Sequence, residues 1–147
     1  ALDGDDLMGI EIGFEGPGFE ARKATLAPFW QAVLEEGVAT HEELSALGKR
    51  VGLASWLNPV VPGNVYYIHA ISVKEAYRGK KVGYALMQNA IEQARAGGYR
   101  GVQLDVLSDN PAVQFYRSMG FECRVESIAP IPHEHGVPME MRMELRF

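Results

Sequence analysis

The spacing of hydrophobic residues in the N-terminal third of this 147-residue chain predicts one strand followed by two helices. Leu7 to Phe14 is strand-like and follows the turn-forming residues Asp3 to Asp6. Either more sequence precedes the chain, or this turn caps a strand that pairs with a later one. Apolar residues recur every three or four positions from Leu26 to Leu34, as in an amphipathic helix that Gly37 ends. Thr40 opens a capping box and with it a second, short helix.

The pattern sharpens at Val65 and predicts a strand, helix, strand unit of the parallel crossover type. Val65 to Val73 is almost continuously apolar, which favours a strand that is covered on both faces. Residues from Val82 to Ala94 repeat at helical spacing until Gly97 closes the helix. Gly101 to Leu107 then alternates apolar and polar residues, as a strand does.

The last third is predicted to contain one helix and two strands. Asn110 followed by proline is typical of an N-cap and a first helical position, and a helix of about ten residues should follow. Phe121 to Ile128 and Met139 to Phe147 are strand-like, and the second of them alternates methionine or leucine with charged residues. The intervening segment, Pro130 to Pro138, is too rich in proline for regular structure.

Composition and charge exclude several classes of protein. The chain is 47% hydrophobic and 22% charged, which predicts one globular domain over residues 1–147. A single cysteine, Cys123, cannot form an intrachain disulfide, and no long apolar run or leader-like segment stands out, so we expect a cytoplasmic protein that does not enter a membrane. The net charge of −5 argues against a nucleic-acid partner.

The segment Arg78 to Gly83 has the properties of an anion cradle. It joins the predicted buried strand to a helix whose first backbone N–H groups have no intrahelical partner, and a glycine-containing turn there can wrap a phosphate or pyrophosphate. Arg78, Lys80 and Lys81 add three positive charges. The order of residues is neither that of a Walker A loop nor that of a dinucleotide-binding Gly-x-Gly-x-x-Gly turn.

This turn resembles the Arg/Gln-x-x-Gly-x-Gly/Ala turn of the GCN5-related N-acetyltransferase (GNAT) superfamily, with Lys81 in the first glycine position and Gly83 in the second. Ile71-Ser72-Val73 precedes it, as the end of the corresponding strand does in that family. The run from Asn110 to Phe121, with Tyr116 at its centre, matches the family's Asn, Tyr and Gly-Phe pattern. The resemblance covers about the C-terminal half of the chain.

The resemblance implies a mixed α/β fold with a mostly antiparallel sheet, flanking helices and a central parallel pair that splays apart, here with N-terminal elements that are short or missing. Acetyl-coenzyme A would enter between Val65–Val73 and Gly101–Leu107. The residues implied in cofactor binding are Ile71, Ser72, Val73, Arg78, Gly79, Lys80, Lys81, Val82, Gly83, Tyr84, Asn110 and Tyr116.

The catalytic residues that we expect are Tyr116 and His69. Tyr116 occupies the family position of the general acid, and a phenol is protonated at neutral pH. His69 could accept the proton of the amine, with Glu75 or an ordered water as rivals. No metal is expected, because His133, Glu134 and His135 lack the spacing and third partner of a zinc site. Cys123 is a poor nucleophile candidate because no histidine lies near it in sequence.

The predicted function is transfer of an acetyl group from acetyl-coenzyme A to a primary amine by direct attack in a ternary complex. The amine would be a small molecule or a peptide, and a homodimer is conceivable. Its pocket is expected among Leu26–Leu47, Tyr66, Tyr67 and Pro130–Pro138, which vary with substrate in this family. The alternative is a non-catalytic module that binds or senses coenzyme A. Lys81 keeps this alternative open, because it stands where the family usually has glycine.

Overall fold

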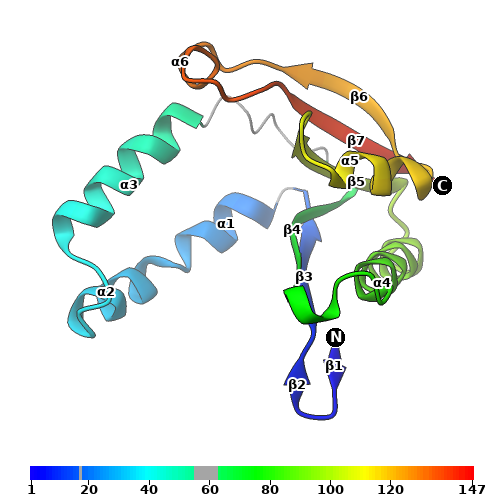
Figure 1. Ribbon diagram of the computed structural model, residues 1–147, viewed down its shortest axis with the longest axis horizontal. Coiled ribbons are helices and arrows are strands. Elements are labelled where there is room, and N and C mark those ends of the chain that lie inside the picture. Colours follow the sequence, from blue (N-terminus) through cyan, green and yellow to red (C-terminus); the bar gives the residue numbers. More distant parts are fainter. Residues whose placement is uncertain (17, 55–62) are drawn as a thin grey trace.

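The described part of the chain forms three strands, then three helices, and then strands and helices in alternation. A computed structural model describes residues 1–16, 18–54 and 63–147 (Figure 1). In chain order the elements are β1 (Leu2–Asp3), β2 (Asp6–Leu7), β3 (Gly9–Glu15), α1 (Gly18–Ala24), α2 (Ala27–Glu35), α3 (His41–Ala54), β4 (Tyr66–Val73), a short 3-10 helix (Glu75–Tyr77), α4 (Val82–Ala96), β5 (Gly101–Leu107), α5 (Ala112–Ser118), β6 (Glu122–Ser127), α6 (Pro130–Glu134) and β7 (Glu140–Arg146).

Five strands form one sheet in the order β3-β4-β5-β7-β6. The pair β4–β5 is parallel, and the other neighbouring pairs of this sheet are antiparallel. Parallel pairing of β4 with β5 covers only Tyr66–Ile68 against Val102–Leu104. Beyond Ile68 each strand continues to pair on its outer side, β4 with β3 and β5 with β7. The predicted mixed α/β fold with a splayed parallel pair is therefore confirmed.

The hydrophobic core lies between this sheet and α4. Helix α4 contacts β3, β4 and β5, and it buries Met87, Ala90 and Ala94 completely, as the helical repeat predicted. The helix ends at the C-cap Gly97. Buried residues of the sheet and of α5 complete the cluster, among them Ile68, Val102, Leu104, Val106, Val113, Tyr116, Met141 and Met143.

The N-terminal third differs from the prediction mainly in where its elements break. The turn-forming residues connect β1 to β2 in a short hairpin, and β3 then pairs with β4. Helix α1 precedes the predicted amphipathic helix, and α3 is longer than expected at 14 residues. The capping box of α3 is confirmed, because the Thr40 N–H donates to Glu43 at 2.8 Å and the Glu43 N–H donates to Thr40 at 3.2 Å.

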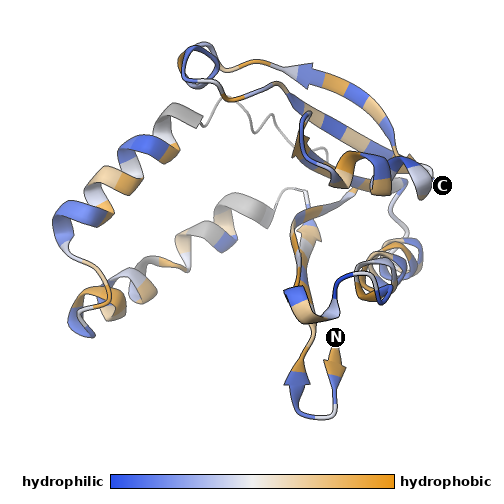
Figure 2. Ribbon diagram, viewed as in Figure 1, coloured by the Kyte–Doolittle hydropathy of each residue, from blue (hydrophilic) through white to orange (hydrophobic). Residues whose placement is uncertain are grey.

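Helices α1 to α3 extend away from the sheet in Figure 1, on the side opposite to α4. Helix α1 contacts β3, and α3 contacts α6. Large apolar side chains remain exposed on this arm, including Phe29 at 65% and Trp30 at 48%. Hydrophobic positions appear as orange segments on α2 and α3 in Figure 2. Among the helices in the described ranges, none is both long and apolar enough to cross a membrane.

The prediction that residues 130–138 lack regular structure is wrong, because α6 forms there. Pro130 and Pro132 lie in its first turn, where a proline loses no helical hydrogen bond and has a dihedral angle that suits a helix. Helix α5 is seven residues long and not about ten. Strands β6 and β7 form within the predicted ranges, and apolar and polar residues alternate along both in Figure 2. Residues 59–64, rich in proline and glycine, are predicted to form a loop, and most of them lie outside the described residues.

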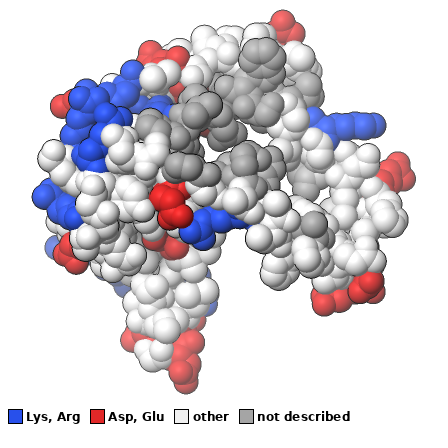
Figure 3. Space-filling model, turned by 180° about the vertical axis from the view of Figure 1, so that it is seen from behind, with Lys and Arg blue, Asp and Glu red and all other residues white. Residues whose placement is uncertain are grey.

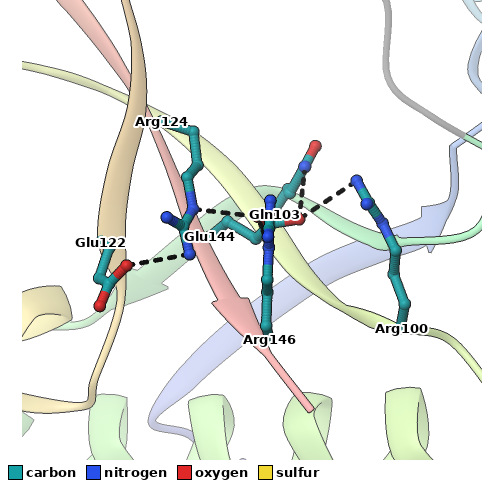
Figure 4. Close-up of polar contacts among 6 residues, drawn as sticks. All are labelled: Arg100, Gln103, Glu122, Arg124, Glu144 and Arg146. Carbon is teal, nitrogen blue, oxygen red and sulfur yellow. Dashed lines mark hydrogen bonds and ion pairs between the residues drawn. The ribbon is translucent and has the colours of Figure 1, made fainter.

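The polar face of β7 is buried, although alternation alone gave no sign of it. Glu144 is 1% exposed, and its carboxylate accepts hydrogen bonds from Arg146 at 2.6 Å, Gln103 at 3.0 Å and Arg124 at 3.1 Å, with Arg100 at 3.3 Å (Figure 4). Burial alone would raise the pKa of Glu144, but these partners outweigh it and hold the pKa below its ordinary value. The network ties β5, β6 and β7 together.

Candidate functional site

A cavity of about 800 Å³ opens where β4 leads through a turn into α4. Its walls come from the end of β4, the turn, the first residues of α4 and the start of α5. The lining residues are Ile71, Val73, Tyr77, Arg78, Gly79, Lys81, Val82, Gly83, Tyr84, Asn110, Ala112, Phe115 and Tyr116. The structure thus brings the predicted cofactor-binding residues together, except for Ser72 and Lys80. Ser72 lies on the opposite face of β4 from Ile71 and Val73, because side chains alternate along a strand.

Two residues with positive φ shape the turn. Gly79 has φ 74 and Lys81 has φ 63, and Lys81 is the sole non-glycine residue with positive φ in the described part of the chain. Lys81 is the N-cap of α4 and makes no side-chain capping hydrogen bond. The first N–H groups of α4 are therefore left for another acceptor, and the helix dipole favours an anion there.

The fold does not require glycine at position 83. Its φ is not positive, and a Cβ atom added to Gly83 would contact only the Val73 Cγ2 atom, at an ordinary 3.7 Å. Alanine would fit in the free protein and would suit a helix better. What the missing side chain does provide is an open approach from the cavity to the backbone of the first turn of α4.

The hairpin β1–β2 braces this turn from outside. The Asp6 carboxylate accepts hydrogen bonds from Lys74 and from the Tyr77 hydroxyl, both at 2.6 Å. The Lys74 N–H donates to the Met8 carbonyl oxygen at 2.9 Å. Acidic side chains cluster at the hairpin tip, seen in red at the bottom of Figure 3. The hairpin therefore fixes the segment that connects β4 to the cavity.

Tyr116 is a buried residue of the cavity wall. It is 6% exposed, and its ring packs between those of Phe115 and Phe121, with centroid distances of 5.4 and 6.0 Å. Burial raises the pKa of the Tyr116 phenol, so the hydroxyl remains protonated at neutral pH. Asn110 accepts a hydrogen bond from the Ala112 N–H at 2.9 Å at the start of α5. The helix begins one residue later than predicted, with Pro111 and not Asn110 as its N-cap residue.

A second cavity of about 290 Å³ occupies the gap between the splayed halves of β4 and β5. It shares Ile71, Asn110 and Tyr116 with the first, so the two cavities meet around the Tyr116 ring. His69 lines this second cavity from β4, and its side chain is exposed. Glu75, the rival proton acceptor, lies in the 3-10 helix and lines neither cavity.

Glu140 also lines the second cavity, although no sequence motif points to it. It is the first residue of β7, opposite Leu107 of β5. Its Oε2 atom is buried and, among the described residues, has no hydrogen-bond donor. Burial and the nearby Asp105 raise the pKa of Glu140 to about 7, against an opposing effect of Arg142. In the sequence Glu140 is one more charged residue of an alternating strand, which gives no signal of this environment.

The residues expected to bind the acceptor amine lie elsewhere. Neither cavity is lined by described residues of 26–47 or 130–138, or by Tyr66 or Tyr67. The Tyr67 hydroxyl donates to Asp105 at 2.8 Å, and the Tyr66 hydroxyl to Glu11 at 3.5 Å. These tyrosines are thus engaged within the sheet.

His133, His135 and Cys123 are the other potentially reactive side chains that the sequence analysis considered. His133 and His135 each place Nδ1 within 3.2 Å of a backbone carbonyl oxygen, and no group of potential metal ligands occurs in the ranges that the structure covers. Burial raises the pKa of the Cys123 thiol, which lowers the fraction of reactive thiolate at neutral pH.

Comparison with known proteins agrees with this architecture. Residues 15–121 match the acetyltransferase (GNAT) family, and the chain belongs to that family. An uncharacterized N-acetyltransferase of Methanocaldococcus jannaschii is 39% identical over 80 residues, which are 51% of this chain and 35% of that protein. The N-alpha-acetyltransferase RimI of Mycobacterium tuberculosis is 40% identical over 58 residues, which are 39% of this chain and 35% of that protein. The chain thus matches about a third of the length of these curated relatives.

Solved structures show the same fold. An N-acetyltransferase from Staphylococcus aureus Mu50 aligns over 99% of this chain and 67% of its own, with a TM-score of 0.67 and 17% identity. A putative streptothricin acetyltransferase from Bacillus anthracis, solved with acetyl-coenzyme A, aligns over 57% of this chain and 50% of its own, with a TM-score of 0.53 and 26% identity.

Proposed function

We propose that this chain transfers an acetyl group from acetyl-coenzyme A to a primary amine by direct attack in a ternary complex. The observation that carries the proposal is the large cavity, which joins an uncapped helix N-terminus to a buried tyrosine through the unpaired edge of a strand. These are an anion site, a slot for an extended chain and a proton donor, in that order along one cavity. The solved relative with bound acetyl-coenzyme A supports the choice of ligand.

The cofactor would be held by the backbone of the turn and by the edge of β4. Its pyrophosphate would lie on residues 78–84, where N–H groups and basic side chains favour an anion. Its pantetheine arm would lie along Ile71 to Val73, because the inner edge of β4 has no partner strand after Ile68 among the described residues. A backbone N–H of this edge can donate to the thioester oxygen, and such a preorganised donor stabilises the oxyanion of the tetrahedral intermediate.

The reaction would need one proton removed from the amine and one supplied to the thiolate. Tyr116 fits the second role, because its pKa is raised and it lines the point where the cavities meet. The amine would enter by the smaller cavity. Peptide N-termini and antibiotics of the streptothricin type are the first acceptors to test, since similar proteins carry those names.

Gly83→Ala tests the coenzyme site without disturbing the fold. The methyl group has room in the free protein but stands in the path of the ligand, so we expect the Kd for acetyl-coenzyme A to rise roughly tenfold, about the loss of one backbone hydrogen bond. Gly48→Ala is the matched control, because Gly48 lies in α3 with open space around its Cα. Equal affinities of the two variants by calorimetry would exclude the proposed cradle.

Tyr116→Phe tests the chemistry. The variant should bind acetyl-coenzyme A as the wild type does, yet release coenzyme thiol on the order of 100 times more slowly in the presence of an accepted amine. Unchanged turnover would show that Tyr116 is not the acid. Binding of acetyl-coenzyme A without thiol release by the wild-type protein, over the whole amine panel, would favour the alternative of a coenzyme A sensor.

A further inference from the structure

Four charged residues occupy alternate positions on one face of β7, namely Glu140, Arg142, Glu144 and Arg146. Arg142 forms a bidentate ion pair with Asp105, at 2.9 Å through Nε and 2.7 Å through the terminal nitrogen. Glu144 is surrounded by arginines (Figure 4). Charges that a fold buries for its own stability are paired in this way.

Glu140 does not follow that rule. Its Oε2 is buried, and the part of the chain that the structure describes offers this atom no donor. A buried acceptor without a donor destabilises the folded state unless a ligand supplies the donor. The carboxyl group of Glu140 also lines the small cavity that shares Tyr116 with the coenzyme site. An incoming ligand with N–H groups would complete its hydrogen bonding.

The groups around Glu140 favour an exchangeable proton. The charges of Asp105 on β5 and Arg142 on β7 act on Glu140, and Glu140 acts in turn on the Tyr67 phenol of β4. His69 and Tyr116 line the same cavity. Burial is the main cause that raises the pKa of Glu140, and the charge of Asp105 adds to it. Asp105 itself cannot serve as the base, because Arg142 and the Tyr67 hydroxyl occupy its oxygens.

We propose that Glu140 is the proton acceptor of the transfer reaction, and that the ammonium group of the acceptor amine is the missing donor for its Oε2. The proposal rests on the proposed function and assigns a base that the motifs of the chain do not indicate. It places the amine between β4 and β5, across the small cavity from the Tyr116 hydroxyl. Its substrate class is a primary amine that arrives as an ammonium ion.

The proposed reaction transfers the acetyl group with one net proton released. Glu140 takes one proton from the ammonium, and the freed nitrogen lone pair forms the C–N bond to the thioester carbon. The C–S bond breaks, and the coenzyme thiolate takes the phenol proton of Tyr116. The nitrogen then loses its second proton, which restores the phenol, and Glu140 releases its proton to solvent. The products are the amide, the coenzyme thiol and one proton.

The test compares wild type, Glu140→Gln, His69→Gln and Glu126→Gln by thiol release from acetyl-coenzyme A. The amine probes are an alanyl tetrapeptide amide, Nα-acetyl-lysine amide and spermidine. With the probe that reacts fastest, the turnover of each protein is then measured from about pH 6 to pH 10. Glu140→Gln should lose kcat about 100-fold near pH 7, and the loss should shrink as the pH approaches the pKa of the free amine. Glu126 is exposed on β6, so its variant should match the wild type.

Each outcome has one meaning. A Glu140→Gln variant with the turnover and pH profile of the wild type would overturn the assignment of Glu140. The assignment would also be overturned if the rise of kcat with pH were lost in His69→Gln and kept in Glu140→Gln. A wild type that transfers to no probe contradicts the proposed function itself. Independently of turnover, carbon NMR of the wild-type carboxyl groups should show Glu140 titrating near 7, and titration near its ordinary value of 4.5 would also overturn the proposal.

Discussion

Replacing Lys81 with glycine should stabilise the protein, because the backbone there adopts a conformation that glycine tolerates best. Lys81 has φ 63 and ψ 13 and caps the N-terminus of α4. The left-handed conformation costs a non-glycine residue about 1–2 kcal/mol. A cation at a helix N-terminus costs a further ~0.3–1 kcal/mol. The greater freedom of glycine in the unfolded chain offsets roughly 0.5–1 kcal/mol of this gain.

The balance is a gain of about 1 kcal/mol in the free energy of unfolding, or roughly 3 °C in melting temperature for a chain of this size. Urea unfolding followed by circular dichroism measures it. Lys81→Ala removes the same charge but keeps the left-handed strain, so it should gain less. Lys80→Gly should lose stability, because Lys80 lies outside the left-handed region. If Lys81→Gly and Lys81→Ala are equally stable, the argument from backbone strain is wrong.

Two further predictions concern the carboxylates of β7. Glu144→Gln should lower the free energy of unfolding by about 2–3 kcal/mol, because it leaves the surrounding arginines without their shared carboxylate. The control is Glu122→Gln, which removes an exposed ion pair and should lower it by about 0–1 kcal/mol. Equal losses in urea unfolding would contradict this prediction. The folded-state pKa of Glu140 lies above its ordinary value, so its charge destabilises the fold increasingly as the pH rises from about 4.5 to about 7. Glu140→Gln should therefore unfold with a free energy on the order of 1 kcal/mol higher than wild type at about pH 8, after allowance for solvent screening, and with no difference at about pH 4. A difference that is the same at both pH values would refute the assignment of that pKa.

The sequence predicted the elements between residues 65 and 121 well because local patterns determine them. The repeat from Val82 to Ala94 and the glycine at 97 are sufficient to specify α4. Asn110 with its proline predicts the start of α5 to within one residue. Residues of the turn before α4 were predicted to meet around one ligand, and the cavity brings most of them together. Lys80 of the turn and Ser72 of β4 were the exceptions. For Ser72 the reason is that a motif does not tell which face of a strand a side chain occupies.

What the sequence could not predict depends on strand order. Strand β7 inserts between β5 and β6, and no local pattern in residues 139–147 indicates this. The insertion is what buries Glu144 on the polar face and places Glu140 beside a cavity built mainly from β4 and β5. Helix α6 differs from the prediction for another reason, because proline breaks a helix in its interior but fits the first turn, where Pro130 and Pro132 lie.

The central claim is that this chain moves an acetyl group from coenzyme A to an amine, and the most direct test is product analysis by mass spectrometry. Purified protein is incubated with acetyl-coenzyme A and the amine panel, with Tyr116→Phe in parallel. We predict an acetylated amine that forms in step with free coenzyme A thiol, and formation on the order of 100 times slower in the variant. An amine panel that remains unmodified while the protein binds acetyl-coenzyme A would contradict the claim.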